Sequence, residues 1–229
     1  MTLKEQEAAL FKEWKKEYDV FTYDGLFDEK EFLAQPIKIL YILKEANWPG
    51  LEDDLHLVDW LLSEKSSTYW KTWNNIARWT QALTIGGEYP RNVSRHDKSY
   101  WLRKVAFVDL KKVPGGSRAD KEQVREHVSQ DKDFIKKQIS IYSPDIIICC
   151  GRGNGKNADL LYEFVFQENG NPEWSKTPVG DKYNYFYVSI NGKNVPVVSF
   201  VHPQMIASHA KLEQYYNDML TIKQSLLKI

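Results

Sequence analysis

The chain has 229 residues, with 31 basic and 31 acidic side chains and therefore no formal net charge. This balance excludes the global positive field by which small, highly basic nucleic-acid coat proteins bind their ligand. The two cysteines, Cys149 and Cys150, are adjacent, which excludes a disulfide framework or a four-thiolate metal centre within one chain. No apolar run approaches the roughly 18 residues of a membrane span, and residues 1–18 lack the apolar core of a signal peptide. We therefore expect a cytoplasmic protein that does not interact with membranes.

In chain order, the first predicted element is an amphipathic helix that ends near Tyr18, because apolar residues recur at helical spacing among charges. Pro36 precedes the apolar run 37–43, which is typical of a strand buried on both faces. Similar runs predict strands at 104–108, 145–150 and 195–201, the last after a hairpin signal at Asn191-Gly192. Helical patterns lie between these strands, at 55–62, 69–83, 122–142, 157–166 and 205–227. Asp120, followed by Gln123, indicates where the helix over 122–142 begins.

The alternation of strands and helices predicts an α/β fold, a three-layer α/β/α domain with a four-stranded, mainly parallel central sheet. We assign residues 36–229 to this domain and residues 1–35 to an N-terminal helical extension packed on it. Open α/β sheets bind ligands outside the carboxyl ends of their strands. The segments that follow the four strands are 44–50, 109–118, 151–155 and 202–204, and together they supply carboxylates, cations and a histidine. The sequence therefore predicts a ligand site at this edge of the sheet.

The strand-end segments resemble those of a known family. Lys44-Glu45-Ala46-Asn47 and His202-Pro203-Gln204 are similar to the Gly-Glu-Ala-Pro-Gly and His-Pro-Ser motifs in the bacterial and archaeal branch of the uracil-DNA glycosylase superfamily. Residues 108–115, with Arg118, resemble its Thr-Asn-hydrophobic-hydrophobic-Lys segment and the Pro-rich loop after it. Lys137-Gln138-Ile139 and the strand led by Pro144 resemble its Arg-Gln-Ile helix and Pro-led strand. The resemblance covers roughly residues 36 to 220.

The resemblance implies a uracil-DNA glycosylase-like fold that binds a nucleobase in the strand-end crevice and hydrolyses an N-glycosidic bond in DNA, as in base-excision repair. It implies that Glu45 orients water or stabilises the sugar cation and that His202 stabilises the leaving base. The implied base-binding residues are Ala46, Asn47, Asp109, Trp70 and Trp73, with Trp48 and Tyr69 as further aromatic candidates. The implied phosphate-binding residues are Lys111, Ser117, Arg118 and Gln204. We expect the partner to be DNA or a small molecule that contains a nucleobase, and the protein to be a monomer.

The sequence departs from the family pattern at three points. Lys44 replaces the first glycine, which places a long cation where the family brings its backbone close to the base. Asp109 replaces the asparagine that reads the base edge, and an ionised carboxylate can only accept hydrogen bonds. The four cysteine ligands of that branch are absent, so we expect no iron-sulfur cluster, and we predict no metal and no other cofactor.

Each candidate residue also has a structural interpretation. Glu45 could form an ion pair with a nearby cation, and His202 could bind a backbone group before Pro203. The tryptophans could pack the core, because Trp73, Ala77 and Thr80 have helical spacing. The basic stretch 111–125 could be a solvated surface, and residues 151–156 fit a glycine-rich turn better than a phosphate loop. Asp53, Asp54 and His56 form a weak candidate for a metal site.

Two functional alternatives follow from the same residues. The first is a non-catalytic module that binds a nucleotide or nucleic acid, which the replacements at Lys44 and Asp109 favour. The second is an enzyme that acts on a small nucleoside or nucleotide, which the zero net charge favours.

Overall fold

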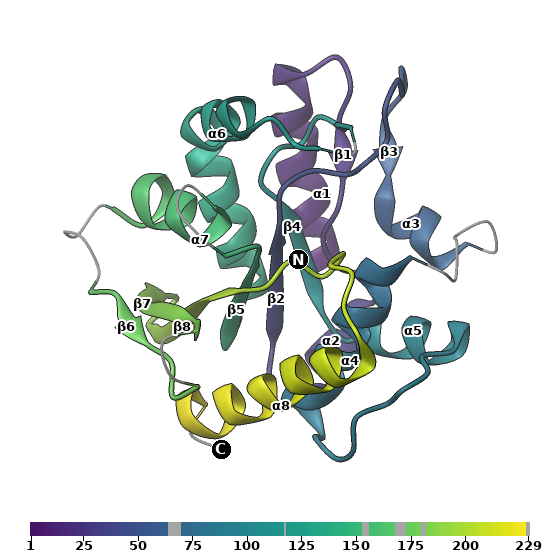
Figure 1. Ribbon diagram of the computed structural model, residues 1–229. Coiled ribbons are helices and arrows are strands. Elements are labelled where there is room, and N and C mark those ends of the chain that lie inside the picture. Colours follow the sequence, from purple (N-terminus) through teal and green to yellow (C-terminus); the bar gives the residue numbers. More distant parts are fainter. Residues whose placement is uncertain (64–69, 117, 153–155, 168–172, 180–181, 228–229) are drawn as a thin grey trace.

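The computed structural model describes residues 1–63, 70–116, 118–152, 156–167, 173–179 and 182–227. Within these residues a six-stranded sheet has the strand order β4-β2-β5-β8-β7-β6 (Figure 1). Its strands are β2 (Ile39–Leu43), β4 (Ala106–Asp109), β5 (Ile146–Cys150), β6 (Ser175–Lys176), β7 (Asn184–Ile190) and β8 (Lys193–Phe200). The predicted strands correspond to β2, β4, β5 and β8, which are mutually parallel. The predicted total of four is wrong, because β7 and β6 extend the sheet in antiparallel order beyond β8.

Helices cover both faces of the parallel strands, which is why every residue of β2 and of β5 is buried. The helices are α1 (Leu3–Trp14), α2 (Glu29–Leu33), α3 (Leu57–Leu62), α4 (Lys71–Thr84), α5 (Arg95–Leu102), α6 (Lys121–Tyr142), α7 (Asn157–Leu160) and α8 (His209–Leu226). A short 3-10 turn (Lys15–Glu17) continues α1, and a π-helical turn (Leu161–Val165) continues α7. The chain is therefore an α/β protein with a mainly parallel central sheet between helical layers.

The two faces of the sheet carry separate hydrophobic clusters. One cluster joins alternate strand residues to α3, α4 and α8, and it includes Tyr41, Phe107 and Phe200. The other joins the intervening strand residues to α1, α6 and α7, and it includes Leu40 and Ile147. This division follows from the period of two in a strand, which sends successive side chains to opposite faces.

Residues 1–35 form part of the layer that covers the second face. Phe11 and Trp14 of α1 belong to the same cluster as Ile42, and α1 lies beside α6 (Figure 1). β1 (Thr22–Tyr23) pairs in parallel with β3 (Leu55–His56), which ties this segment to the chain after β2. The N-terminal segment thus contributes to the core and extends beyond a single helix.

Two local predictions agree with the structure. The Asp120 side chain accepts hydrogen bonds from the backbone of Glu122 and Gln123 and caps α6. Asn191 and Gly192 have φ values of 49° and 78°, the left-handed conformation that a tight hairpin turn requires, and they join β7 to β8. Among the described residues, no helix has the length and apolar character needed to cross a membrane.

Candidate functional site

A cavity of about 650 Å³ lies at the carboxyl ends of β2 and β4, beside the residues that follow β8. Parallel pairing places Leu43 opposite Asp109, so the segments after β2 and β4 leave the sheet side by side. Ten of the predicted candidate residues line the cavity: Glu45, Ala46, Asn47, Trp48, Trp70, Trp73, Asp109, Arg118, His202 and Gln204. Ser117 lies outside the described residues. The tertiary structure thus brings strand-end segments that are far apart in the sequence into one site.

Glu45 forms a buried ion pair with Lys111. The Lys111 Nζ lies 2.6 Å from the Glu45 Oε2, and the two side chains are only 7% and 5% exposed. Lys111 was predicted to contact phosphate, but its ammonium group instead binds Glu45 and does not line the cavity. The physical reason is the backbone pairing of the two loops, in which the Lys111 N–H donates to the Lys44 carbonyl at 2.7 Å.

Gly115 covers the Glu45 carboxylate. A Cβ atom at Gly115 would lie 2.1 Å from the Glu45 Oε1, so any side chain there would overlap the carboxylate. The Gly115 N–H donates to the Ala46 carbonyl at 2.8 Å, and the Trp48 N–H donates to the Gly115 carbonyl at 2.9 Å. Sequence reasoning did not single out Gly115, because its requirement comes from the approach of two loops.

Asp109 lines the cavity, and its carboxyl group is buried. The residue is 1% exposed, and neither carboxyl oxygen has a hydrogen-bond partner among the described residues. The pKa of Asp109 is raised to about 8, mainly by burial, with the charges of Asp24 and Glu45 acting in the same direction and that of Lys112 opposing them. At neutral pH the protonated group therefore has one donor and one acceptor. The limit to accepting hydrogen bonds, which holds for an ionised Asp109, does not apply to this protonated form.

His202 lies two residues beyond the end of β8 and lines the cavity. Its Nδ1 accepts a hydrogen bond from the backbone N–H of Gln204 at 3.2 Å. Partial burial lowers the pKa of His202, and the charges of Lys44 and Lys156 lower it further. In the neutral ring the proton is then on Nε2, which makes that atom a hydrogen-bond donor.

Cations gather around the cavity. Lys44, Lys71 and Arg118 line it, and within the described residues none of the three has a carboxylate at ion-pair distance. Burial lowers the pKa of Lys44, and the neighbouring charges of Lys156 and Lys121 add to this effect. Sequence reasoning missed Lys71, although its position directly after Trp70 was a usable signal.

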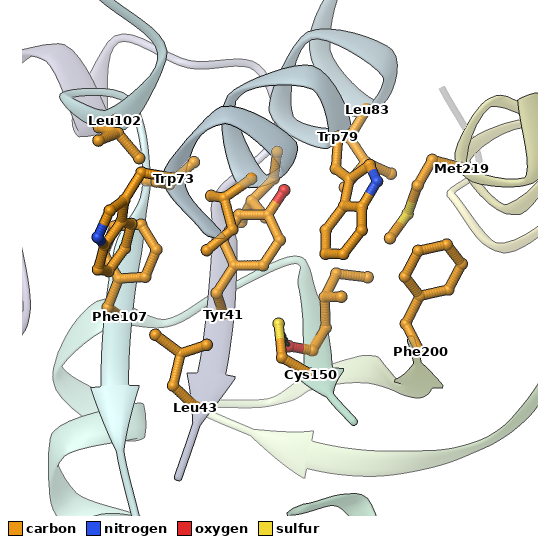
Figure 2. Close-up of a cluster of buried hydrophobic side chains, with 14 of the residues drawn as sticks. Tyr41, Leu43, Trp73, Trp79, Leu83, Leu102, Phe107, Cys150, Phe200 and Met219 are labelled. Atoms are coloured by element: carbon orange, nitrogen blue, oxygen red, sulfur yellow. Dashed lines mark hydrogen bonds between the residues drawn. The ribbon is translucent and has the colours of Figure 1, made fainter. Parts of the chain in front are cut away.

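The aromatic residues of this region divide between core and cavity. Trp73 packs edge-on against Phe107, with ring centroids 5.2 Å apart and an interplanar angle of 84° (Figure 2). Trp73 also lines the cavity, as does Leu57. Trp70 is 38% exposed and lines the same cavity, whereas Tyr69 lies outside the described residues. Trp73 therefore fits both the structural and the functional interpretation, and Trp70 fits the functional one.

Two other candidate features point away from ligand binding. The Asn157 side chain donates to the carbonyls of Cys150 and Ile42, at 2.7 Å and 3.1 Å, so it ties the turn after β5 to β2. Residues 153–155 of the glycine-rich stretch lie outside the described residues. Asp54 accepts from the Phe21 backbone and pairs with Lys15, and no cluster of potential metal ligands occurs in the described part of the chain.

A buried polar network lies behind the site, on the α6 side of the sheet. Lys112 pairs with Asp24 and donates to the Gln138 Oε1 at 3.0 Å. Gln138 in turn donates to Asp24 and to the Tyr142 hydroxyl, and that hydroxyl donates to Glu7 at 2.6 Å. Lys112 and Gln138 occupy two of the segments that carry the family resemblance, and the fold brings them into contact.

A comparison with models of known protein families found no match to this sequence, and a comparison with curated proteins found none either. The fold and the cavity define an α/β protein with a cavity at the carboxyl edge of its mainly parallel sheet. The cavity combines aromatic and apolar walls with a buried carboxyl group, a histidine with a lowered pKa, and cations that have no carboxylate at ion-pair distance among the described residues.

Proposed function

We propose that this protein binds a nucleobase in the strand-end cavity and hydrolyses the N-glycosidic bond that joins the base to deoxyribose in DNA. The observation that carries the proposal is the Asp109 carboxyl group, which is buried at the cavity without a partner among the described residues. A buried polar group without a hydrogen bond costs free energy. A ligand edge with one donor and one acceptor, as nucleobases have, would satisfy this group once it is protonated.

The remaining roles follow from the chemistry of the bond. Cleavage develops positive charge on the sugar and negative charge on the departing base. Glu45 stabilises the sugar cation and accepts a proton from water as the water oxygen bonds to C1′. The C1′–N bond breaks with its electron pair on the base, and the Nε2–H of His202 donates to the base anion.

The strand order of the sheet sets the separation between Glu45 and His202. β2 and β8 are not neighbours, because β5 lies between them. Two strand spacings amount to roughly 10 Å, which leaves room for a sugar and its base between Glu45 and His202. Trp73 and Leu57 supply apolar surface for the base, since both line the cavity.

The test uses purified protein and oligonucleotides that contain uracil, hypoxanthine, xanthine or a mismatched base, followed by alkaline cleavage of abasic sites. We expect cleavage of at least one substrate, and a loss of about 100-fold or more in Glu45→Gln and in His202→Ala. Circular dichroism of each variant controls for folding. Activity that survives in the Glu45→Gln/His202→Ala double variant would overturn the assignment of both roles.

The second candidate is a nucleobase-binding module without hydrolysis. The observation that favours it is the Glu45 carboxylate, which is held by Lys111 and covered by Gly115. This candidate predicts saturable binding of a nucleotide that Asp109→Leu abolishes, with no base released on long incubation. Base release by the wild type would exclude it.

A further inference from the structure

Three tryptophans form a continuous aromatic wall beside the cavity. Trp48 follows β2, Trp60 belongs to α3, and Trp70 lies at the start of α4. The Trp48 and Trp60 ring centroids are 4.9 Å apart with an interplanar angle of 89°, and those of Trp60 and Trp70 are 4.8 Å apart at 36°. Trp48 and Trp70 line the cavity, and Trp60 contacts both of their rings.

The wall offers an aromatic face next to the cavity. Trp70 is 38% exposed, although an indole is among the side chains that gain most from burial. An exposed ring at the edge of a pocket is suited to stack on another flat group, and every nucleobase has such a face. In a duplex both faces of a base are covered by its neighbours, so only an unstacked base can use this wall.

The charge of the same region is complementary to a polyanion. Lys71 directly follows Trp70, and Arg118 lines the cavity with it. The carboxylates of the cavity do not neutralise these cations, because Glu45 is paired with Lys111 and Asp109 is buried. The acidic segment 52–54 does not line the cavity, and its Asp54 pairs with Lys15.

We infer that the substrate of this site is single-stranded DNA, with one base in the cavity, the adjacent base stacked on Trp70, and the phosphate between them bound by Lys71 and Arg118. The inference rests on the proposed function, since it takes the cavity as a nucleobase site. It adds a substrate class and three residues that select it, Trp70, Lys71 and Arg118. Because only an unstacked base can stack on the wall, tight binding requires that the strands are separated.

The experiment measures the affinity of the full chain for a fluorescein-labelled 12-nucleotide DNA, single-stranded or annealed to its complement, by fluorescence anisotropy. We expect the single strand to bind at least tenfold more tightly than the duplex. Trp70→Ala should weaken single-strand binding roughly fivefold or more, and Trp70→Phe should restore part of it, because stacking needs a ring. The matched control is Trp174→Ala, since Trp174 is 36% exposed but packs on Tyr162 and Phe186 beside β6.

The salt dependence tests the phosphate contacts separately. Each lost phosphate contact should reduce the slope of log affinity against log salt concentration by about 0.7 for a single strand. We expect this change for Lys71→Ala and for Arg118→Ala, and none for Lys12→Ala, which alters an exposed cation of α1. An unchanged slope in both Lys71→Ala and Arg118→Ala would overturn the assignment of these residues as phosphate ligands.

The outcomes also distinguish this inference from the proposed function. Equal affinity for single strand and duplex, or equal loss in Trp70→Ala and Trp174→Ala, would overturn the inference even if base release occurs. A different result would be no base release and no nucleoside binding, together with a single-strand preference that depends on Trp70. That result would support single-strand binding by the aromatic wall and would overturn the proposal that the cavity binds a base.

Discussion

The Lys111 ammonium group lies 2.6 Å from the Glu45 carboxylate, and this buried ion pair joins the loop after β4 to the loop after β2. The proposed catalytic carboxylate and a predicted phosphate ligand are therefore one structural unit. Removing one member of a buried ion pair leaves the other charge buried and unpaired, which is strongly destabilising. Removing both charges leaves no unpaired charge and avoids this loss of stability.

The first prediction concerns this pair. Lys111→Met should lower the free energy of unfolding by about 3 kcal/mol, because it leaves Glu45 buried without its counter-ion. The double variant Glu45→Gln/Lys111→Met should recover most of that loss. Urea unfolding of the wild type, Lys111→Met, Glu45→Gln and the double variant gives the coupling energy between the two residues. Simple additivity of the single effects would show that the two residues do not interact.

The second prediction concerns Asp109 and pH. Burial, together with the charges of Asp24 and Glu45, raises its pKa from an ordinary 3.8 to about 8, so between these values the unfolded chain releases a proton that the folded chain retains. Stability should then fall as pH rises through this window, by up to about 1.4 kcal/mol per pH unit from this one group. Asp109→Asn cannot ionise and should lack this contribution.

Thermal or urea unfolding of wild type and Asp109→Asn at intervals between pH 4.5 and 8.5 measures the difference. Burial also raises the pKa of Glu7 and of Asp131, but both groups are present in both proteins and cancel in the comparison. Two parallel stability curves would mean that Asp109 is ionised in the fold across this range.

The third prediction concerns Gly115. Gly115→Ala should displace the Glu45 carboxylate, because the new Cβ would lie 2.1 Å from its Oε1. We expect a loss of about 1–3 kcal/mol in stability and a larger loss of ligand binding or base release. Gly116→Ala is the matched control for stability, since a Cβ there meets nothing within 4 Å. Equal behaviour of the two variants would contradict the close approach of the loops.

The fourth prediction concerns the buried network on the α6 side. Gln138→Leu removes the hydrogen bonds from Lys112, to Asp24 and to the Tyr142 hydroxyl, and it leaves both ions with fewer partners. We expect a loss of about 2–3 kcal/mol in the free energy of unfolding, as for hydrogen bonds to buried charged groups. Gln130→Leu, on an exposed position of the same helix, is the control and should change stability by no more than about 0.5 kcal/mol. A similar loss in both variants would point to a helix effect instead.

Local sequence patterns were sufficient for the elements that depend on nearby residues. The buried runs at β2 and β5 are continuous apolar stretches, and the Asn191-Gly192 turn and the Asp120 cap depend on local backbone chemistry. The ends of parallel strands meet at one edge of a sheet, so the grouping of Asp109 and His202 at one cavity also followed from the sequence. Most of the elements missed were short or lay in polar parts of the chain, such as α5, β1 and β6. The exception is β7, a seven-residue strand with alternating apolar side chains that the hairpin signal at Asn191-Gly192 could have indicated.

What the sequence determined by itself is therefore the strand-end placement of the candidate residues, because strand direction and apolar patterning are encoded locally. Only the tertiary structure decided their chemical state. Lys111 is 66 residues from Glu45, and its choice between a phosphate and that carboxylate depends on how two loops pair. The proton on Asp109 likewise depends on burial and on the charge of Asp24, 85 residues away. Burial and charge are sums over the whole packed chain, and no local pattern of residues contains them.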